Sequence, residues 1–161
     1  MVVVSTVRQQ ALDGTGGALR QVAPVLKESF LVLNGDDLYH PDDMQTLIAG
    51  GPAILGMETT QAERFGLLEP DVLGNVASII ERPHHHTSGL VNTGAYFLDR
   101  GALDLPLVAI GNGEYGLPQA LAAAHEIYPV RVLRAKAWLP IGAPEDLPLA
   151  EQFLITHGLV R

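Results

Sequence analysis

Cysteine is absent from the 161-residue sequence, so disulfide bonds and thiolate metal sites are excluded. Basic residues are also scarce, because 10 Lys and Arg stand against 18 Asp and Glu and the net charge is −8 at pH 7. A protein that binds the phosphate backbone of nucleic acid needs clustered positive charge, and this chain has no basic run. We therefore expect no nucleic-acid partner.

Long hydrophobic runs are missing as well. None approaches the roughly 20 apolar residues that span a bilayer, so we expect no membrane contact. Residues 1–4 are too short for a signal peptide, and no basic segment precedes them. Together with the lack of cysteine, this fits a cytoplasmic protein. Hydrophobic residues form 47% of the chain and charged ones 17%, which indicates a folded domain rather than a disordered chain.

The stretch from Phe30 to Tyr39 is the most informative one that is present. Residues 30–33 are apolar without polar alternation, and a turn rich in Asn, Gly and Asp follows, which predicts a strand buried on both faces of a parallel sheet. Ligands of open α/β sheets bind where such strands end, and there Gly35 would admit a ligand and Asp36 would supply a carboxylate. A carboxylate beside phosphates indicates Mg²⁺. The alternative is a strand end capped by an Asx turn.

Hydrophobic patterning predicts strands that alternate with helices over the first part of the chain. We expect an opening strand at residues 2–4 and a helix that starts near Thr15 as its N-cap. The other expected strands are 30–33, 53–57, 65–69, 76–81, 90–98 with an interruption at 92–94, and 128–133. We also expect one helix that starts at Pro41 and two that span 117–124 and 144–154. Strand 76–81 would pair with 65–69 as a hairpin. The prediction is a single α/β domain over residues 1–161 with a mixed sheet.

Five motifs in order carry a resemblance to a known family: Gln9 with Gly14-Thr15-Gly16, Asn34-Gly35-Asp36-Asp37, Glu81-Arg82-Pro83, Asn92-Thr93-Gly94, and the stretch from Trp138 to Leu147. No single motif is specific, but their order and spacing match the family over nearly all 161 residues. The chain resembles the sugar-1-phosphate nucleotidylyltransferases, which join a nucleoside triphosphate to a sugar 1-phosphate and release pyrophosphate. The resemblance implies their Rossmann-like mixed-sheet fold, these two substrates, and Mg²⁺ as cofactor.

The resemblance also implies roles for the nucleotide-binding residues. Gln9 matches a glutamine that hydrogen-bonds the pyrimidine edge, for which an amide offers a donor beside an acceptor, and Gln10 is the alternative by one position. Gly14 and Thr15 match the pair that lines the base and the ribose.

By resemblance, the later motifs supply the residues that bind the sugar ring and the metal. By resemblance, Gly66, Glu81, Asn92 and Thr93 hold the sugar, whose hydroxyls a carboxylate and an amide can bind. Arg82 stands where the family has lysine and would pair with the sugar phosphate, although Arg and Lys are not equivalent there.

Asp36 matches the metal-binding aspartate, and a register error of one position would exchange it with Asp37. The implied reaction is an in-line attack of a sugar-phosphate oxygen on the α-phosphorus. Positioning and charge neutralisation then supply most of the catalytic effect.

Two parts of the family's pattern are missing. No G-x-G-T-R loop with a following lysine occurs, and the G-T-G at Gly14 is not that loop, because no Arg or Lys follows within it. We therefore expect a fold that is incomplete at its N-terminal side, with residues 2–7 near an open sheet edge. Three alternatives stay open: the chain is a fragment, its start is misplaced, or a homo-oligomer or an N-terminal chain completes the sheet and covers such an edge.

In the family's W-x-D-x-G-T-P pattern, the aspartate position is here Pro140, which cannot bind a metal through its side chain. Glu145 and Asp146 lie nearby, where they complement a helix dipole. We therefore expect this chain alone to be inactive or weakly active. Two alternatives stay open: a non-catalytic module that binds nucleotides or NDP-sugars, and a subunit that completes a partner's sheet.

Overall fold

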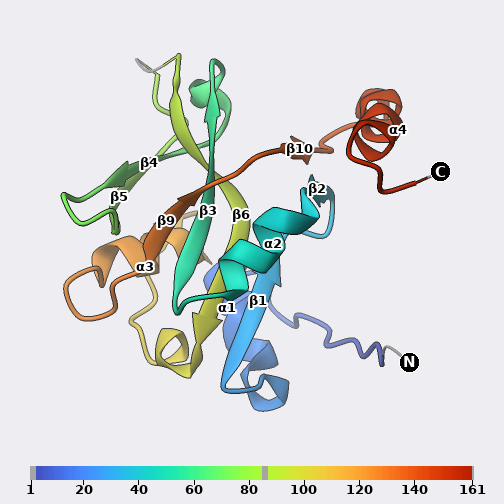
Figure 1. Cartoon of the computed structure of the whole chain (residues 1–161). Helices are drawn as coiled ribbons and strands as arrows, with labels where there is room; N and C mark the ends of the chain where they lie inside the picture. The colour runs from blue at the N-terminus through green and yellow to red at the C-terminus, as the bar shows by residue number, and fades with distance from the viewer. Residues whose placement is uncertain (1–2, 85–86, 161) are drawn as a thin grey trace.

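A six-stranded mixed sheet forms the centre of the computed structural model, which describes residues 3–84 and 87–160 (Figure 1). The strands follow the order β5–β4–β6–β3–β9, and β1 pairs with β6 on the edge that β4 also uses. Only β3 and β9 run parallel, so the prediction of a mixed sheet is confirmed. Its strands are β1 Ser29–Leu33, β3 Ala53–Thr59, β4 Gly66–Pro70, β5 Val76–Glu81, β6 Gly89–Asp99 and β9 Arg131–Arg134.

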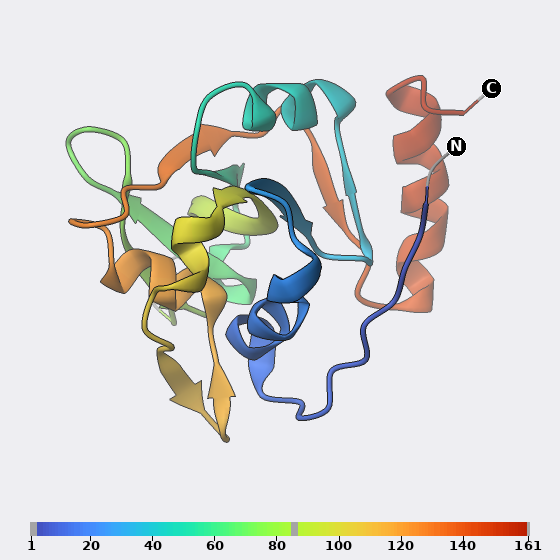
Figure 2. The ribbon, with the colours of Figure 1, turned by 90° about the horizontal axis from the view of Figure 1, so that it is seen from below.

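Helices cover both faces of this sheet (Figure 2). The α-helices are α1 Gly14–Val22, α2 Pro41–Ile48, α3 Leu117–Ala123 and α4 Leu147–Thr156. Helix α2 lies on one face, α1 and α3 lie on the other, and α4 stands at the side. Two small ribbons pair β2 Asp37–Tyr39 with β10 Trp138–Pro140, and β7 Ala109–Gly111 with β8 Glu114–Tyr115. Short 3-10 helices are η1 Ala23–Val25, η2 Ala62–Arg64, η3 Arg100–Leu103 and η4 Pro144–Asp146.

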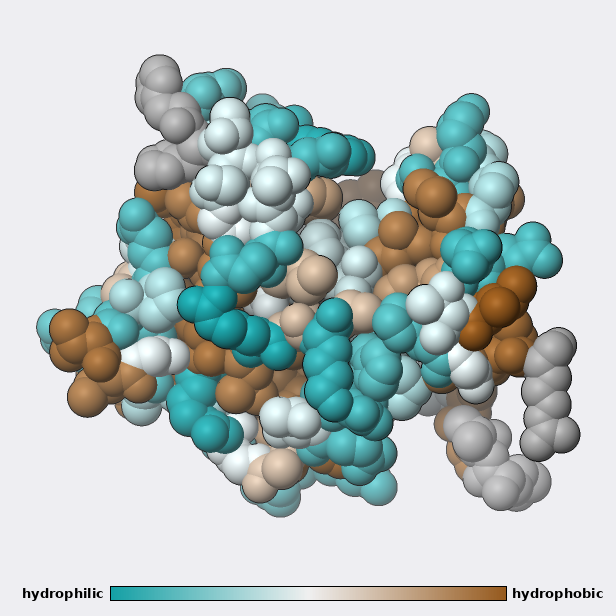
Figure 3. All heavy atoms as spheres, turned by 45° about the horizontal axis from the view of Figure 1, so that its top comes forward, coloured by the Kyte–Doolittle hydropathy of each residue, from teal (hydrophilic) through white to brown (hydrophobic). Residues whose placement is uncertain are grey.

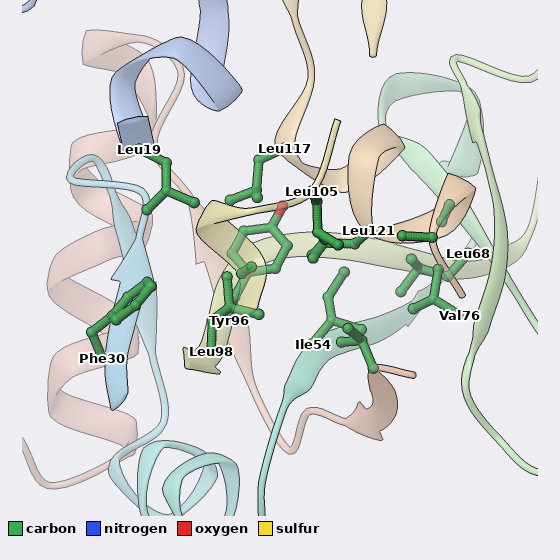
Figure 4. Close-up of a cluster of buried hydrophobic side chains, with 14 of the residues drawn as sticks. Leu19, Phe30, Ile54, Leu68, Val76, Tyr96, Leu98, Leu105, Leu117 and Leu121 are labelled. Carbon is green, nitrogen blue, oxygen red and sulfur yellow. The ribbon is translucent and has the colours of Figure 1, made fainter. Parts of the chain in front are cut away.

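The larger hydrophobic core lies between the sheet and helices α1 and α3 (Figure 4). It joins Leu19 of α1 and Leu121 of α3 to Ile54 of β3 and Leu98 of β6. A second cluster lies under α2, where Leu47 packs on the other side of the sheet. No helix among the described residues is long and apolar enough to cross a membrane.

The strand at residues 30–33 forms, but the prediction that it is parallel and buried on both faces is wrong. β1 runs antiparallel to β6, and within the described residues its second edge has no partner strand. Phe30 is 8% exposed, whereas Leu31 and Leu33 are 40% and 44% exposed. The unbroken apolar run therefore forms an edge strand with one buried face, because its pairing partner, β6, lies far away in the sequence.

The predicted opening strand is also wrong where it can be compared. Val3 and Val4 are in irregular backbone and 82% exposed, and Val7 is exposed as well, so they add to no sheet edge; Val2 lies outside the described residues. Side chains of high β-propensity do not form a strand where no neighbouring strand takes up their backbone hydrogen bonds.

Other predicted elements need smaller corrections. Helix α1 starts one residue before Thr15, and Asp13 occupies the N-cap position. Strand β6 is continuous through residues 92–94, but its pairing with β3 is irregular at the expected place, because Ile54 pairs with Tyr96 and Gly56 with Asn92, and Gly94 has a φ of +73°. Helix α2 at Pro41, the β4–β5 hairpin and α3 are confirmed.

Hydrophobic side chains remain at the surface in several places, and two of these carry more than one side chain outside β1 and the N-terminal segment (Figure 3). One is the turn between β4 and β5, where Val72 and Leu73 are exposed. The other is α4, where Leu147, Leu149 and Ile155 are exposed and only Ala150 is buried. Helix α4 therefore contributes little to the core.

Thr93 forms a hydrogen bond at an irregular point in the pairing of β3 and β6. The register between β3 and β6 shifts between Ile54 and Gly56, at Leu55. The hydroxyl of Thr93, which is fully buried, donates a 2.8 Å hydrogen bond to the carbonyl of Leu55. This bond satisfies a carbonyl at the point where the regular pairing shifts.

Replacing Thr93 with Val is expected to lower the free energy of unfolding by about 2 kcal/mol, since the Leu55 carbonyl would lose a donor inside the core. Thr93→Ser keeps the hydroxyl and should cost less than Thr93→Val if the hydrogen bond is the larger contribution. Urea unfolding followed by circular dichroism measures both. Equal stability of Thr93→Val and the parent chain would contradict this role.

Candidate functional site

The first turn of α3 connects two parts of the predicted site. The backbone N–H of Leu117 donates to the hydroxyl of Thr15 over 2.9 Å, and the side-chain amide of Gln119 donates to Glu81 over 2.7 Å. Thr15 belongs to the predicted nucleotide-binding residues and Glu81 to the predicted sugar-binding residues. One helix turn thus joins both groups on the same face of the sheet.

The predicted nucleotide-binding residues lie together at the start of α1. The side-chain amide of Gln9 donates to Asp13 over 2.8 Å and to the carbonyl of Gly14 over 3.2 Å. Gly14 has a φ of +87°, and a Cβ there would lie 2.5 Å from the carbonyl oxygen of Tyr115. Glycine at this position therefore lets α1 approach β8 closely. Contact with a base remains a prediction for these residues.

Gly66, Glu81 and Asn92 lie on neighbouring strands of the sheet. Gly66 pairs with Glu81 between β4 and β5, and a Cβ on Gly66 would lie 3.1 Å from a carboxylate oxygen of Glu81. Asn92 of β6 donates to the hydroxyl of Tyr96 over 2.8 Å. Burial, together with the nearby charge of Glu81, raises the pKa of Tyr96, which keeps its hydroxyl neutral.

Thr93, which was predicted to hold the sugar, faces the other way. Successive side chains of a strand alternate between its two faces, so Asn92 and Thr93 point to opposite sides of β6. Because the hydroxyl of Thr93 is fully buried and bonded to Leu55, we leave it out of the proposed sugar site.

Asp36 and Asp37 follow β1 and have different surroundings. The carboxylate of Asp37 accepts hydrogen bonds from Asn34 at 3.2 Å, Tyr39 at 3.3 Å and Trp138 at 3.1 Å. The exposed carboxylate of Asp36 has no hydrogen bond with any described residue. Of the two register alternatives, this geometry favours Asp36 as the residue that can bind a ligand.

A magnesium ion would fit beside Asp36. A Cβ built on the adjacent Gly35 meets no atom within 4 Å, so space is open there. The described residues contain no group of three or more His, Asp or Glu placed to hold a metal. Mg²⁺ is commonly bound through one or two carboxylates, with substrate phosphates and water as the remaining ligands. A single carboxylate is compatible with that mode of binding.

Pro140 lies next to this turn. It pairs with Asp37 between β10 and β2, and the N–H of Ile141 donates to the carbonyl of Asp36 over 3.2 Å. The position at which the sequence pattern lacks an aspartate is therefore beside Asp36 in the fold. Asp146 accepts hydrogen bonds from the N–H groups of Gly142 and Ala143, which agrees with its expected role at a helix start.

Arg82 has an uncommon backbone conformation. Its φ is +43°, a region that residues other than glycine rarely occupy. Its N–H donates to the carbonyl of Phe65 over 3.0 Å, while its exposed side chain bonds to no described residue. Strain of this kind is concentrated at functional sites. The guanidinium is thus available for an anion at the end of β5.

Comparison with known proteins identifies the family. The family described as nucleotidyl transferase matches residues 1–157. The chain is 26% identical to the bifunctional protein GlmU of Methanocaldococcus jannaschii over 94% of this chain and 38% of that protein. It is 28% identical to the UTP–glucose-1-phosphate uridylyltransferase AglF of Haloferax volcanii, over 95% of this chain and 68% of that protein. The chain belongs to the nucleotidyl transferase family.

Solved structures have the same fold. A UDP-glucose pyrophosphorylase, crystallised with UDP-glucose, superposes with a TM-score of 0.76 at 20% identity, over 94% of this chain and 66% of that one. The predicted α/β mixed-sheet fold is therefore confirmed. The chain spans less than two-fifths of the length of the GlmU proteins that it matches.

Two clefts border residues of the predicted site, and a third lies apart from it. One of about 370 Å³ lies between α1 and β1 and is bordered by Thr15 and Asn34. Another of about 370 Å³ is lined by Trp138 and Pro140, beside the Asp36 turn. The third, of about 560 Å³, lies at Glu58 and Ser88, and none of these three clefts is lined by Asp36 or Glu81. We assign the site from the chemistry of its side chains because a shallow polar surface also binds phosphates. His84 is exposed, and His85 and His86 lie outside the described residues.

Asp43 holds the segment before β10 against α2. Its carboxylate is buried and accepts hydrogen bonds from the N–H groups of Lys136 at 2.8 Å and Ala137 at 3.3 Å. The exposed neighbour Asp42 forms a 2.7 Å ion pair with the ammonium of Lys136, which lowers the pKa of Asp42. Asp43 therefore helps to set where Pro140 and the Asp36 turn meet.

Asp43→Ala is expected to lower the free energy of unfolding by about 2 kcal/mol, because two backbone N–H groups lose a buried acceptor. Asp42→Ala is the matched control and should cost much less, since exposed ion pairs are weak. Urea unfolding measures both variants. If the control lost as much stability as Asp43→Ala, the buried hydrogen bonds would not be the cause.

Proposed function

We propose that the chain carries the sugar-phosphate-binding part of a site that forms an NDP-sugar and pyrophosphate from a nucleoside triphosphate and a sugar 1-phosphate. The observation that carries this proposal is the free carboxylate of Asp36 in a turn whose neighbour Asp37 is fixed by three donors. Family membership and the similarity to a structure that holds UDP-glucose support the same substrates.

Each residue has one task in the proposed reaction. Asp36 would hold Mg²⁺, which when bound supplies positive charge for the phosphates. The guanidinium of Arg82 binds the phosphate of the sugar and orients its attacking oxygen towards the α-phosphorus. Glu81 accepts hydrogen bonds from the sugar hydroxyls, and the fixed amide of Asn92 completes that surface. Gln9, Gly14 and Thr15 lie where the base and ribose would bind.

The test is calorimetric binding of UDP-glucose, dTDP-glucose and UDP-N-acetylglucosamine with and without Mg²⁺. We expect Mg²⁺-dependent binding of at least one of them and a loss of about tenfold or more in Asp36→Asn. Asp104→Asn is the control, because this exposed residue follows η3 at the opposite end of β1. Failure of the chain to bind any of the three NDP-sugars would overturn the proposal.

Pyrophosphate release is measured in parallel, with dTTP, UTP, ATP and GTP offered against glucose, N-acetylglucosamine and mannose 1-phosphates. We expect no turnover or weak turnover by this chain alone, because its sequence has no G-x-G-T-R loop and Pro140 replaces an aspartate. NDP-sugar binding that needs no Mg²⁺, with no turnover, would favour the alternative of a non-catalytic binding module.

Pro140→Asp tests the second metal position directly. A carboxylate there would lie beside the Asp36 turn, since Ile141 bonds to the Asp36 carbonyl. We expect Mg²⁺ to bind at least about tenfold more tightly in this variant, which is the size of effect that added metal partners have. Pro140→Asn is the uncharged control. Equal Mg²⁺ affinity in all three proteins would show that position 140 does not face the ion.

A further inference from the structure

We propose that Gln119 is a positioning residue that fixes the carboxylate of Glu81 for the sugar ring, an inference that rests on the proposed function. The side-chain amide nitrogen of Gln119 donates to one carboxylate oxygen of Glu81 over 2.7 Å. Glu81 is an exposed residue at the end of β5, and its second oxygen has no hydrogen bond with a described residue. A donor on one oxygen limits the rotation of the carboxylate and leaves the other oxygen for a hydroxyl.

Helix capping does not explain the conformation of Gln119. It is the third residue of α3, where a Gln often accepts from the N–H of the N-cap residue. Here the N-cap is Gly116, whose N–H donates to the carbonyl of Val108 over 3.0 Å instead. The Gln119 side chain folds back against Gly116 so closely that a Cβ there would lie 1.7 Å from its amide oxygen. It therefore reaches the capping position without capping the helix.

This conformation of Gln119 is unfavourable for its amide oxygen. It is buried, and among the described residues it has no hydrogen-bond partner. Exchanging the amide oxygen and nitrogen would not help, because the oxygen would then face the carboxylate of Glu81 and the nitrogen would be buried without an acceptor. A buried acceptor without a donor destabilises a fold. The contact that this conformation preserves is the bond to Glu81.

Gln119 also ties Glu81 to the rest of the site. In the same helix turn, the N–H of Leu117 donates a hydrogen bond to the hydroxyl of Thr15. Glu81 in turn lies close enough to Tyr96 to raise the pKa of that phenol, and Tyr96 accepts from Asn92. The first turn of α3 thus connects the Glu81 carboxylate, through Gln119, to the start of α1, through Leu117.

The experiment compares UDP-glucose with UDP, which lacks the sugar, by calorimetry on the full chain. Gln119→Leu should bind UDP-glucose about tenfold more weakly and UDP unchanged, because only the sugar contact is affected. Gln152→Leu, an exposed glutamine of α4, is the control and should change neither. In a thermal melt Gln119→Leu should be at least as stable as the parent chain, since the unpartnered acceptor is removed.

Gln119→Glu gives a second, pH-dependent readout. Two carboxylates would then face each other, and at neutral pH their repulsion should weaken UDP-glucose binding more than Gln119→Leu does. As the pH falls and the pair takes up a proton, a hydrogen bond between the two can form again and affinity should recover. The parent chain should show no such recovery over the same pH range.

The outcomes separate this inference from the proposed function. If the parent chain binds UDP-glucose more tightly than UDP and Gln119→Leu does the same, the positioning role is wrong while the proposed function stands. Equal losses for both ligands, with a lower melting temperature, would mean that Gln119 only supports the fold. A parent chain that binds no NDP-sugar overturns the proposed function and this inference with it.

Discussion

The alternation of side chains along β6 is the constraint on which the rest of the structure depends. This strand pairs with β1, β3 and β4, so its two faces decide what lies above and below the sheet. Asn92 points to the face of the sheet that α1 and α3 cover, where Glu81 and Tyr96 lie. Thr93 points to the face that α2 covers and donates to the carbonyl of Leu55, where the register of β3 and β6 shifts. A slip of one residue would exchange the two and bury the amide in the core.

Sequence patterning predicted the elements that local spacing determines. The β4–β5 hairpin follows from its turn, in which Asp71 accepts from the N–H groups of Leu73 and Asn75. Helix α2 follows from Pro41 after an N-cap residue. The run at Phe30 was misread because an apolar run does not state whether its neighbours are parallel, or how many it has. These properties belong to pairings across long sequence distances.

The candidate site also contains residues that local motifs indicate and residues that they do not. Motifs predicted Asp36, Glu81, Arg82 and Asn92 as site residues, and the structure gives each a distinct environment while their roles stay a prediction. Gln119 and Tyr96 were missed, since nothing in the sequence around α3 indicates a bond to a residue 38 positions earlier. Thr15 was expected to cap its own helix and instead accepts from α3, 102 positions away. Local rules assign a hydroxyl to the nearest orphan N–H, and tertiary contacts override them.

Electrostatics sets the remaining limit on what this site can do. Among the residues of the two metal motifs, Asp36 supplies one free carboxylate, because Asp37 is bonded to three donors and position 140 is a proline. A hard cation held by one carboxylate depends on the substrate for most of its other ligands. Mg²⁺ and the phosphates would therefore bind together, each weakly without the other. In such a site Arg82, whose planar guanidinium can bind a phosphate through two N–H groups, would carry a larger share of phosphate recognition than a lysine at the same position.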